Sequence, residues 1–105
     1  MSDAIDRLFA TIAARKGSDP GQSYTAKLLA AGVEKCAKKF GEEATETVIA
    51  AIQRDKTELA KESADVLYHL LVLWAASGIT PEDVYTVLKA REAMSGLEEK
   101  ASRKN

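Results

Sequence analysis

The chain has 105 residues, with 15 basic and 16 acidic side chains and a formal net charge of −1, which is the size and composition of one small globular domain. The balanced charge argues against non-specific electrostatic binding of nucleic acid. The longest apolar run, residues 70–76, is far too short to span a membrane. The single cysteine, Cys36, excludes an internal disulfide, so we expect a cytoplasmic protein with neither nucleic-acid nor membrane partners.

The N-terminal half predicts three helices separated by one clear loop. Ser2 can cap a first helix that runs to about Lys16, and four apolar residues share one face of it: Ile5, Leu8, Phe9 and Ile12. The segment "KGSDPGQ", 16–22, contains the main cluster of helix breakers and marks a loop. We expect a short helix over 23–32 and a longer one over 33–54.

The C-terminal half predicts two more helices. Asp55 and Glu58 have the spacing of a capping box and begin a helix that ends at Gly78, a C-cap glycine. The segment "TPED", 80–83, supplies a cap, a proline and two first-turn acids for a last helix that ends at Gly96. No alternating strand pattern appears. The sequence therefore predicts a single all-α domain, 1–105, that is a bundle of four to five helices completed by dimerisation.

Two pairs of carboxylates, Glu43 with Glu46 and Glu62 with Asp65, have i,i+3 spacing on consecutive predicted helices. Helical geometry places Glu62, Asp65 and His69 within about 60° of one another, bordering the apolar face. Mutual repulsion among clustered carboxylates is relieved by a hard divalent cation, and all-oxygen ligands favour Mg²⁺ or Mn²⁺. One histidine and one cysteine are too few for di-iron or zinc. The competing interpretation is a solvated helix face with ordinary ion pairs.

Cationic side chains near these acids are candidates for phosphate contacts. Lys38 and Lys39 directly precede the first acid pair, and Arg91 lies on the last predicted helix. Gly41 falls inside a predicted helix, where glycine costs about 1 kcal/mol relative to alanine. Either the close approach of a ligand to the backbone or a kink in the helix would explain a glycine at this position.

The segments "EEATE", 42–46, and "ESAD", 62–65, resemble the E-E-x-x-E … E-x-x-D signature of the all-α nucleoside triphosphate pyrophosphohydrolases. Four segments extend this likeness to the phosphoribosyl-ATP pyrophosphohydrolase family within that superfamily: "SYTAKLL" (23–29), "KKFGEEATE" (38–46), "ESADVLYHLLVL" (62–73) and "VLKAR" (87–91). The resemblance covers the chain from the first helix to Arg91.

The resemblance implies hydrolysis of phosphoribosyl-ATP to phosphoribosyl-AMP and pyrophosphate, the second step of histidine biosynthesis, by metal-assisted attack of water on the α-phosphorus. The expected Mg²⁺ ligands are Glu43, Glu46, Glu62 and Asp65. Glu42 either supports these ligands or orients the attacking water. The expected substrate contacts are Lys38, Lys39, Arg91, Ser23 and Thr25.

Two other functions remain open at this level. One is a pyrophosphohydrolase of the same superfamily that acts on another nucleotide, such as a house-cleaning or dUTPase-like enzyme. The other is a helical interaction module without catalysis, in which the acids form a solvated face. His69 is either a hydrogen-bonded interior histidine or a participant in the site.

Overall fold

The structure is a computed structural model that describes residues 3–92. These residues form helices without any strand, as predicted: α1 (Asp3–Ala14), α2 (Tyr24–Ala31), α3 (Val33–Ile52), α4 (Lys56–Ser77) and α5 (Pro81–Glu92). The predicted cap at Ser2 and helix end at Gly96 lie outside the described residues. The expected all-α class and the number of helices are confirmed.

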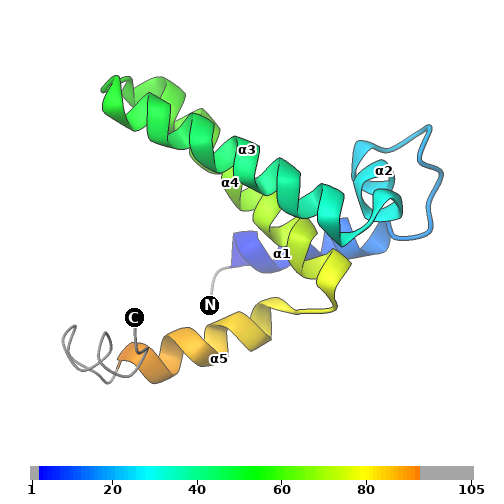
Figure 1. The fold of residues 1–105 in the computed structure, drawn as a ribbon. Coiled ribbons are helices and arrows are strands. Elements are labelled where there is room, and N and C mark those ends of the chain that lie inside the picture. The colour runs from blue at the N-terminus through cyan, green and yellow to red at the C-terminus, as the bar shows by residue number, and fades with distance from the viewer. Residues whose placement is uncertain (1–2, 93–105) are drawn as a thin grey trace.

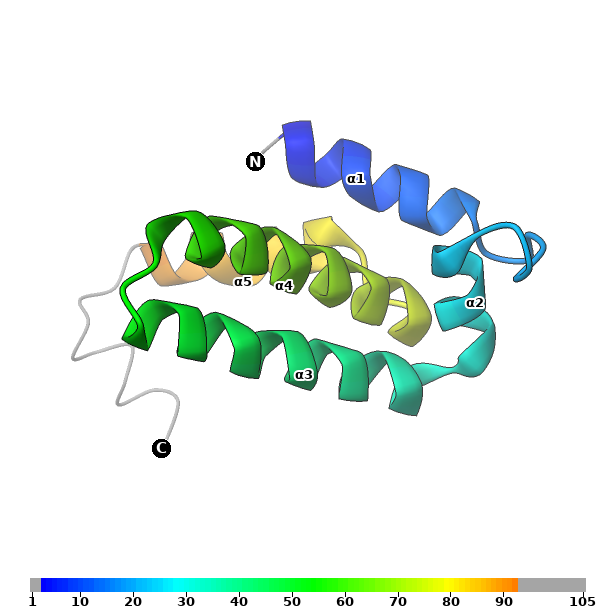
Figure 2. The same cartoon turned by 90° about the horizontal axis from the view of Figure 1, so that it is seen from above.

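The long helices α3 and α4 form an antiparallel hairpin that carries the rest of the fold (Figures 1 and 2). Helix α1 packs along α4 on the side away from α3, and the short α2 connects the end of α1 to the start of α3 (Figure 2). The chain bends by 111° between α4 and α5, and α5 makes only a small contact with α1 (Figure 1). The described chain therefore leaves much of α5 uncovered.

The core lies where α1, α2, α3 and α4 meet. Its buried members are Ile12, Leu28, Cys36, Leu71 and Val72. The predicted apolar face of α1 is confirmed, because Ile12 is buried and Ile5, Leu8 and Phe9 pack against this core. Cys36 is packed as a small apolar side chain, and its thiol donates to the Leu28 carbonyl oxygen at 3.3 Å.

Local capping explains the helix boundaries. The Asp55 carboxylate accepts a hydrogen bond from the Glu58 amide at 3.0 Å and so caps α4. Gly78 ends α4 with φ +78°, and the amides of Gly78 and Ile79 donate to Ala75 and Trp74 in a Schellman motif. Helix α3 ends at Ile52, two residues before the predicted end, because Arg54 adopts a left-handed conformation with φ +59°.

The start of α5 follows the predicted pattern closely. The Asp83 amide donates to the Thr80 hydroxyl at 3.3 Å, and the Asp83 carboxylate accepts from the Thr80 amide at 2.9 Å. This is a complete capping box, with Pro81 at the first helical position.

Within residues 3–92, no single helix has the length and apolar composition needed to cross a membrane. Only α4 and α5 taken together pass that test, across the 111° bend between them.

Candidate active site

The antiparallel pairing of α3 and α4 brings carboxylates from both helices to one place. Glu43 projects from α3, and Glu62 and Asp65 project from α4. One oxygen from each of the three side chains lies within 4.8 Å of the others. The expectation that the two acid pairs face a common point holds for these three residues, which we call the acidic cluster. Glu46 adjoins the cluster and interacts with both Glu43 and Glu62.

Two carboxyl groups of the acidic cluster, Glu43 and Glu62, have raised pKa values. The pKa of Glu62 is raised to about 7, first by a hydrogen bond with the Glu46 carboxyl and then by desolvation and the neighbouring negative charges. Burial, followed by Glu46, raises the pKa of Glu43. A hydrogen bond between two carboxyl groups requires that one of them carry a proton. Repulsion among these acids is therefore relieved by protons in the absence of another cation.

The donor set fits a hard divalent cation. All the converging groups are carboxylates, which are the ligands that such ions prefer. Glu62 Oε2 is buried and has no hydrogen-bond partner among the residues that the structure describes. A buried carboxylate oxygen without a donor is costly, and a bound cation would satisfy it.

Thr47 joins the two helices next to the acidic cluster. Its hydroxyl lies 2.8 Å from the Glu43 carbonyl oxygen on α3 and 3.2 Å from the Glu62 carbonyl oxygen on α4, and it donates its single proton to these two acceptors. Thr47 therefore fixes the spacing of two ligand-bearing turns. The sequence did not single it out, because the second contact depends on how α3 and α4 pack.

His69 lies behind the acidic cluster and is buried, with 6% of its surface exposed. Burial is the main cause that lowers its pKa, so the imidazole is neutral at pH 7. Its Nε2 is 4.0 Å from Glu43 Oε1, too long for a hydrogen bond, and the Tyr24 and Tyr68 rings lie nearly perpendicular to the imidazole, with ring centres 6.3 Å and 4.9 Å away. Because His69 Nδ1 has no partner within residues 3–92, His69 is not the fully hydrogen-bonded interior histidine considered above.

Glu42 points toward the basic residues of α3. Its Oε1 lies 3.2 Å from Lys39 Nζ, and this contact lowers the pKa of Glu42 and raises that of Lys39. Lys39 is partly buried, with 26% of its side chain exposed, whereas Lys38 is fully on the solvent side of α3. The structure therefore sets Glu42 apart from the three converging acids.

The two predicted contacts at the start of α2 have structural partners within the chain. The Ser23 hydroxyl caps α2 by accepting a hydrogen bond from the Ala26 amide at 3.1 Å. The Thr25 hydroxyl is hydrogen-bonded to the Tyr68 hydroxyl on α4. Their role as substrate contacts stays a prediction.

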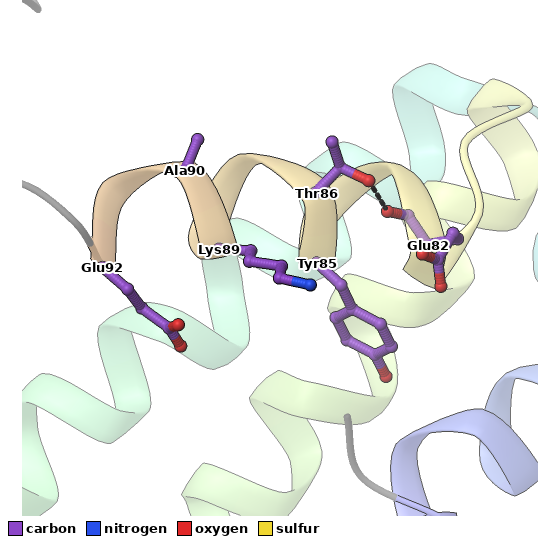
Figure 3. A pocket seen from close by; sticks show the side chains of 6 residues that line it. All are labelled: Glu82, Tyr85, Thr86, Lys89, Ala90 and Glu92. Carbon is purple, nitrogen blue, oxygen red and sulfur yellow. Dashed lines mark hydrogen bonds between the residues drawn. The ribbon is translucent and has the colours of Figure 1, made fainter.

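Several hollows lie on the described surface, and one on α5 is larger than those beside the acidic cluster. It has a volume of about 710 Å³ and follows one face of α5, where Glu82 and Glu92 lie at opposite ends and do not converge (Figure 3). It is lined by Glu82, Tyr85, Thr86, Lys89, Ala90 and Glu92. A second hollow on α5, of about 450 Å³, is lined by Ile79, Asp83, Val84, Val87, Leu88 and Arg91. Figure 1 shows the C-terminal end of α5 well apart from α3 and α4; Arg91 lines the second hollow on α5, and its contact with substrate stays a prediction.

Two further hollows flank the acidic cluster. One, of about 300 Å³, extends toward the turn between α3 and α4 and is lined by Glu46, Ile49, Ala50, Gln53, Glu58 and Glu62. The other, of about 240 Å³, lies between α2 and α3 and is lined by Tyr24, Lys27, Leu28, Ala31, Lys35 and Lys39. The site thus has an acidic centre with a basic hollow on its α2 side.

The chain is similar in sequence to known proteins of one family. The family model for phosphoribosyl-ATP pyrophosphohydrolase matches residues 5–92. A phosphoribosyl-ATP pyrophosphatase of Parvibaculum lavamentivorans is 64% identical over 99 residues, which cover 94% of this chain and 91% of the relative. Proteins of the same name from Cereibacter sphaeroides and Azospirillum brasilense are 60% and 56% identical, over 94% and 96% of this chain and 96% and 91% of the relatives.

Proposed function

Because the chain belongs to the phosphoribosyl-ATP pyrophosphohydrolase family, we propose that it converts phosphoribosyl-ATP and water into phosphoribosyl-AMP and pyrophosphate, the second step of histidine biosynthesis. The protein is a hydrolase that acts on a phosphoric anhydride. The observation that carries the proposal is the convergence of Glu43, Glu62 and Asp65 from two helices in a chain that matches the family over residues 5–92. Residues 1–105 act as one domain in this proposal.

Mg²⁺ is the proposed cofactor, with Mn²⁺ as a substitute, and its ligands are Glu43, Glu46, Glu62 and Asp65. The all-oxygen donor set and the unpartnered Glu62 Oε2 support this assignment. Bound there, the cation would neutralise the triphosphate and polarise its phosphoryl oxygens. Thr47 and the packing of α3 on α4 hold the backbone turns that carry these carboxylates at a fixed spacing.

The other predicted site residues surround this centre. Glu42 is proposed to orient the attacking water, because the contact with Lys39 lowers its pKa and keeps it an ionised acceptor. Lys39 is the stronger candidate for a phosphate contact, since it lies beside the acids and is partly buried, and Lys38 is a weaker one. Ser23 and Thr25 are proposed to contact substrate because they lie at the start of α2, where the backbone N–H groups of a helix favour anions.

We also propose that the protein is a homodimer in the cytoplasm. The apolar side chains Ile79, Val87 and Leu88 of the α5 region are between 40% and 49% exposed, and a second copy would cover them. Arg91 lines the same α5 hollow as Val87 and Leu88 and is proposed to contact substrate.

The test of the reaction is a comparison of substrates. The purified protein with Mg²⁺ is incubated separately with phosphoribosyl-ATP and with the canonical nucleoside triphosphates, and pyrophosphate release is measured. We expect kcat/KM to be highest for phosphoribosyl-ATP. A higher value for a plain nucleoside triphosphate would favour the house-cleaning alternative.

The test of the metal site uses Glu46→Gln and Asp65→Asn. Loss of a ligand should lower activity by about 100-fold or more and weaken Mg²⁺ binding measured by calorimetry, while helix content stays the same. Glu34→Gln is the matched control, because Glu34 is an exposed acid in the first turn of the same helix α3. Unchanged Mg²⁺ affinity in both site variants would instead support the helical interaction module.

A further inference from the structure

The hollow between α2 and α3 is lined by lysines without any acid. Lys27 comes from α2, and Lys35 and Lys39 come from α3. Lys27 and Lys35 form no ion pair with any residue in the range 3–92. Each of the other three hollows has at least one acidic residue in its lining. Lys39 is already paired with Glu42 at 3.2 Å, so Lys27 and Lys35 are the ammonium groups that this hollow of about 240 Å³ offers to an anion.

This lysine hollow lies in line with the acidic cluster. On α3, Lys39 and Lys35 precede Glu43 by four and eight residues, which correspond to about 6 Å and 12 Å along the helix axis. The aromatic ring of Tyr24 forms a wall of the hollow and is 53% exposed. The centre of that ring is 6.3 Å from the centre of the His69 ring, whose Nε2 approaches Glu43 to 4.0 Å. Lys39 and Lys35 therefore extend along α3 away from the acidic cluster, and Tyr24 of α2 adjoins both the lysine hollow and His69 of α4.

The acidic cluster and the separate lysine hollow correspond to the two anionic ends of the substrate of the proposed reaction. Phosphoribosyl-ATP has a triphosphate on one ribose, an adenine in the middle, and a second ribose that ends in a single phosphate. We propose that the lysine hollow binds the phosphate of the phosphoribosyl group while the triphosphate lies at the acidic cluster. This inference rests on the proposed function and adds a determinant of specificity, because ATP has no second phosphate to occupy the hollow.

The two reaction products separate the two ends of the substrate and therefore test the assignment. Phosphoribosyl-AMP keeps the phosphate of the phosphoribosyl group, whereas pyrophosphate comes from the triphosphate end. Binding of each product in the presence of Mg²⁺ is measured by titration calorimetry for the full chain and for Lys27→Gln and Lys35→Gln. Lys16→Gln is the matched control, because Lys16 is an exposed lysine in the loop after α1 and does not line the hollow.

We expect the Kd of phosphoribosyl-AMP to rise roughly five- to tenfold in Lys27→Gln and in Lys35→Gln, since each loses one charged contact to phosphate. The Kd of pyrophosphate should stay within about twofold of the wild-type value in both. In kinetics, KM for phosphoribosyl-ATP should rise with little change in kcat, because the hollow is remote from the scissile bond. Lys16→Gln should change none of these values.

Two results would overturn the inference. Weaker pyrophosphate binding in the lysine variants would assign the hollow to the triphosphate end, and unchanged binding of both products would remove it from the substrate site. Turnover of phosphoribosyl-ATP by the wild-type protein distinguishes these results from failure of the proposed function. If the wild type turns over this substrate while the variants bind phosphoribosyl-AMP normally, only the inference about the hollow is wrong.

Discussion

Glu62 is the residue whose chemistry depends most on its neighbours. Its carboxyl group hydrogen-bonds with Glu46 and faces Glu43 and Asp65, and its pKa rises to about 7. A cation that binds to Glu62 must displace the proton that its carboxyl group holds below about pH 7. We therefore expect the affinity for Mg²⁺ to increase as the pH rises through about 7.

The raised Glu62 pKa also makes a prediction about stability without metal. Between its ordinary pKa of 4.5 and about 7, the folded protein binds more protons at Glu62 than the unfolded chain does. The contribution of Glu62 to the free energy of unfolding is therefore fully present below about pH 4.5 and is lost as the pH rises through about 7. The Glu62→Gln variant carries a neutral side chain at every pH. Relative to wild type, its melting temperature in a chelator should increase between pH 5 and pH 8.

Calorimetric melting of both proteins checks this expectation. His69 titrates with the opposite sign, because its lowered pKa gives a contribution that is present above its ordinary pKa of 6.5 and is lost as the pH falls. His69 is present in both proteins, so subtracting the melting temperature of the variant from that of the wild type largely removes the His69 contribution. A constant difference in melting temperature between the two proteins from pH 5 to pH 8 would contradict the role assigned to Glu62. Added Mg²⁺ should reverse the order at pH 8 by stabilising the wild type more than the variant.

At the scale of single helices, capping and backbone conformation determine where each element begins and ends. Gly78 ends α4 in a left-handed conformation, with φ +78°, whereas Gly41 lies in the interior of α3, which continues unbroken past it. A Cβ atom added at either position would meet no atom within 4 Å. The two glycines therefore differ in backbone conformation and not in the space around them.

Opposite effects of alanine at these two positions follow. Gly41→Ala should raise the free energy of unfolding by about 0.5–1 kcal/mol, because alanine is the better helix former. Gly78→Ala should lower it by about 1–2 kcal/mol, because an L-residue is strained at this φ. Equilibrium unfolding in urea measures both values. Changes of the same sign would contradict the backbone explanation. A loss of activity in a stabilised Gly41→Ala protein would support close approach of a ligand to that turn.

At the scale of the whole molecule, α5 is the element that the rest of the described chain leaves most exposed. It departs from α4 at 111°, and its hollow of about 450 Å³ is lined mostly by apolar side chains. An uncovered apolar face on a chain of 105 residues is consistent with association of two copies.

The dimer proposal predicts that Leu88→Glu shifts the protein toward a monomer. Leu88 is 43% exposed and lines the apolar hollow of α5, so a buried carboxylate there would oppose association. Sedimentation equilibrium gives the mass of the wild type and the variant. Ala90→Glu is the control, because Ala90 lies on the other face of the same helix, in the hollow of Figure 3. A monomeric wild type would contradict the proposal.

The sequence by itself determined the helices, most of their caps and the family of the chain. Hydrophobic periodicity, the Asp55 and Thr80 caps and the i,i+3 acid pairs are local features, since each depends on residues within one or two helical turns. The acid motifs predicted the superfamily, and their combination with the segments "SYTAKLL", "YHLLVL" and "VLKAR" predicted the family that the comparisons confirmed. The end of α3 was missed by two residues because Arg54 adopts a conformation that the sequence pattern does not favour for arginine.

Only the tertiary structure decided which of these residues meet. The packing of α3 on α4 joined Glu43 to Glu62 and Asp65, raised the Glu62 pKa and added Thr47 as a link between the helices. It also separated Lys39, which lines the hollow with Lys27 and Lys35, from Lys38, which does not. Helical spacing fixes the direction of a side chain on its own helix, but contacts between helices depend on crossing angles and axial register, which the packed core sets.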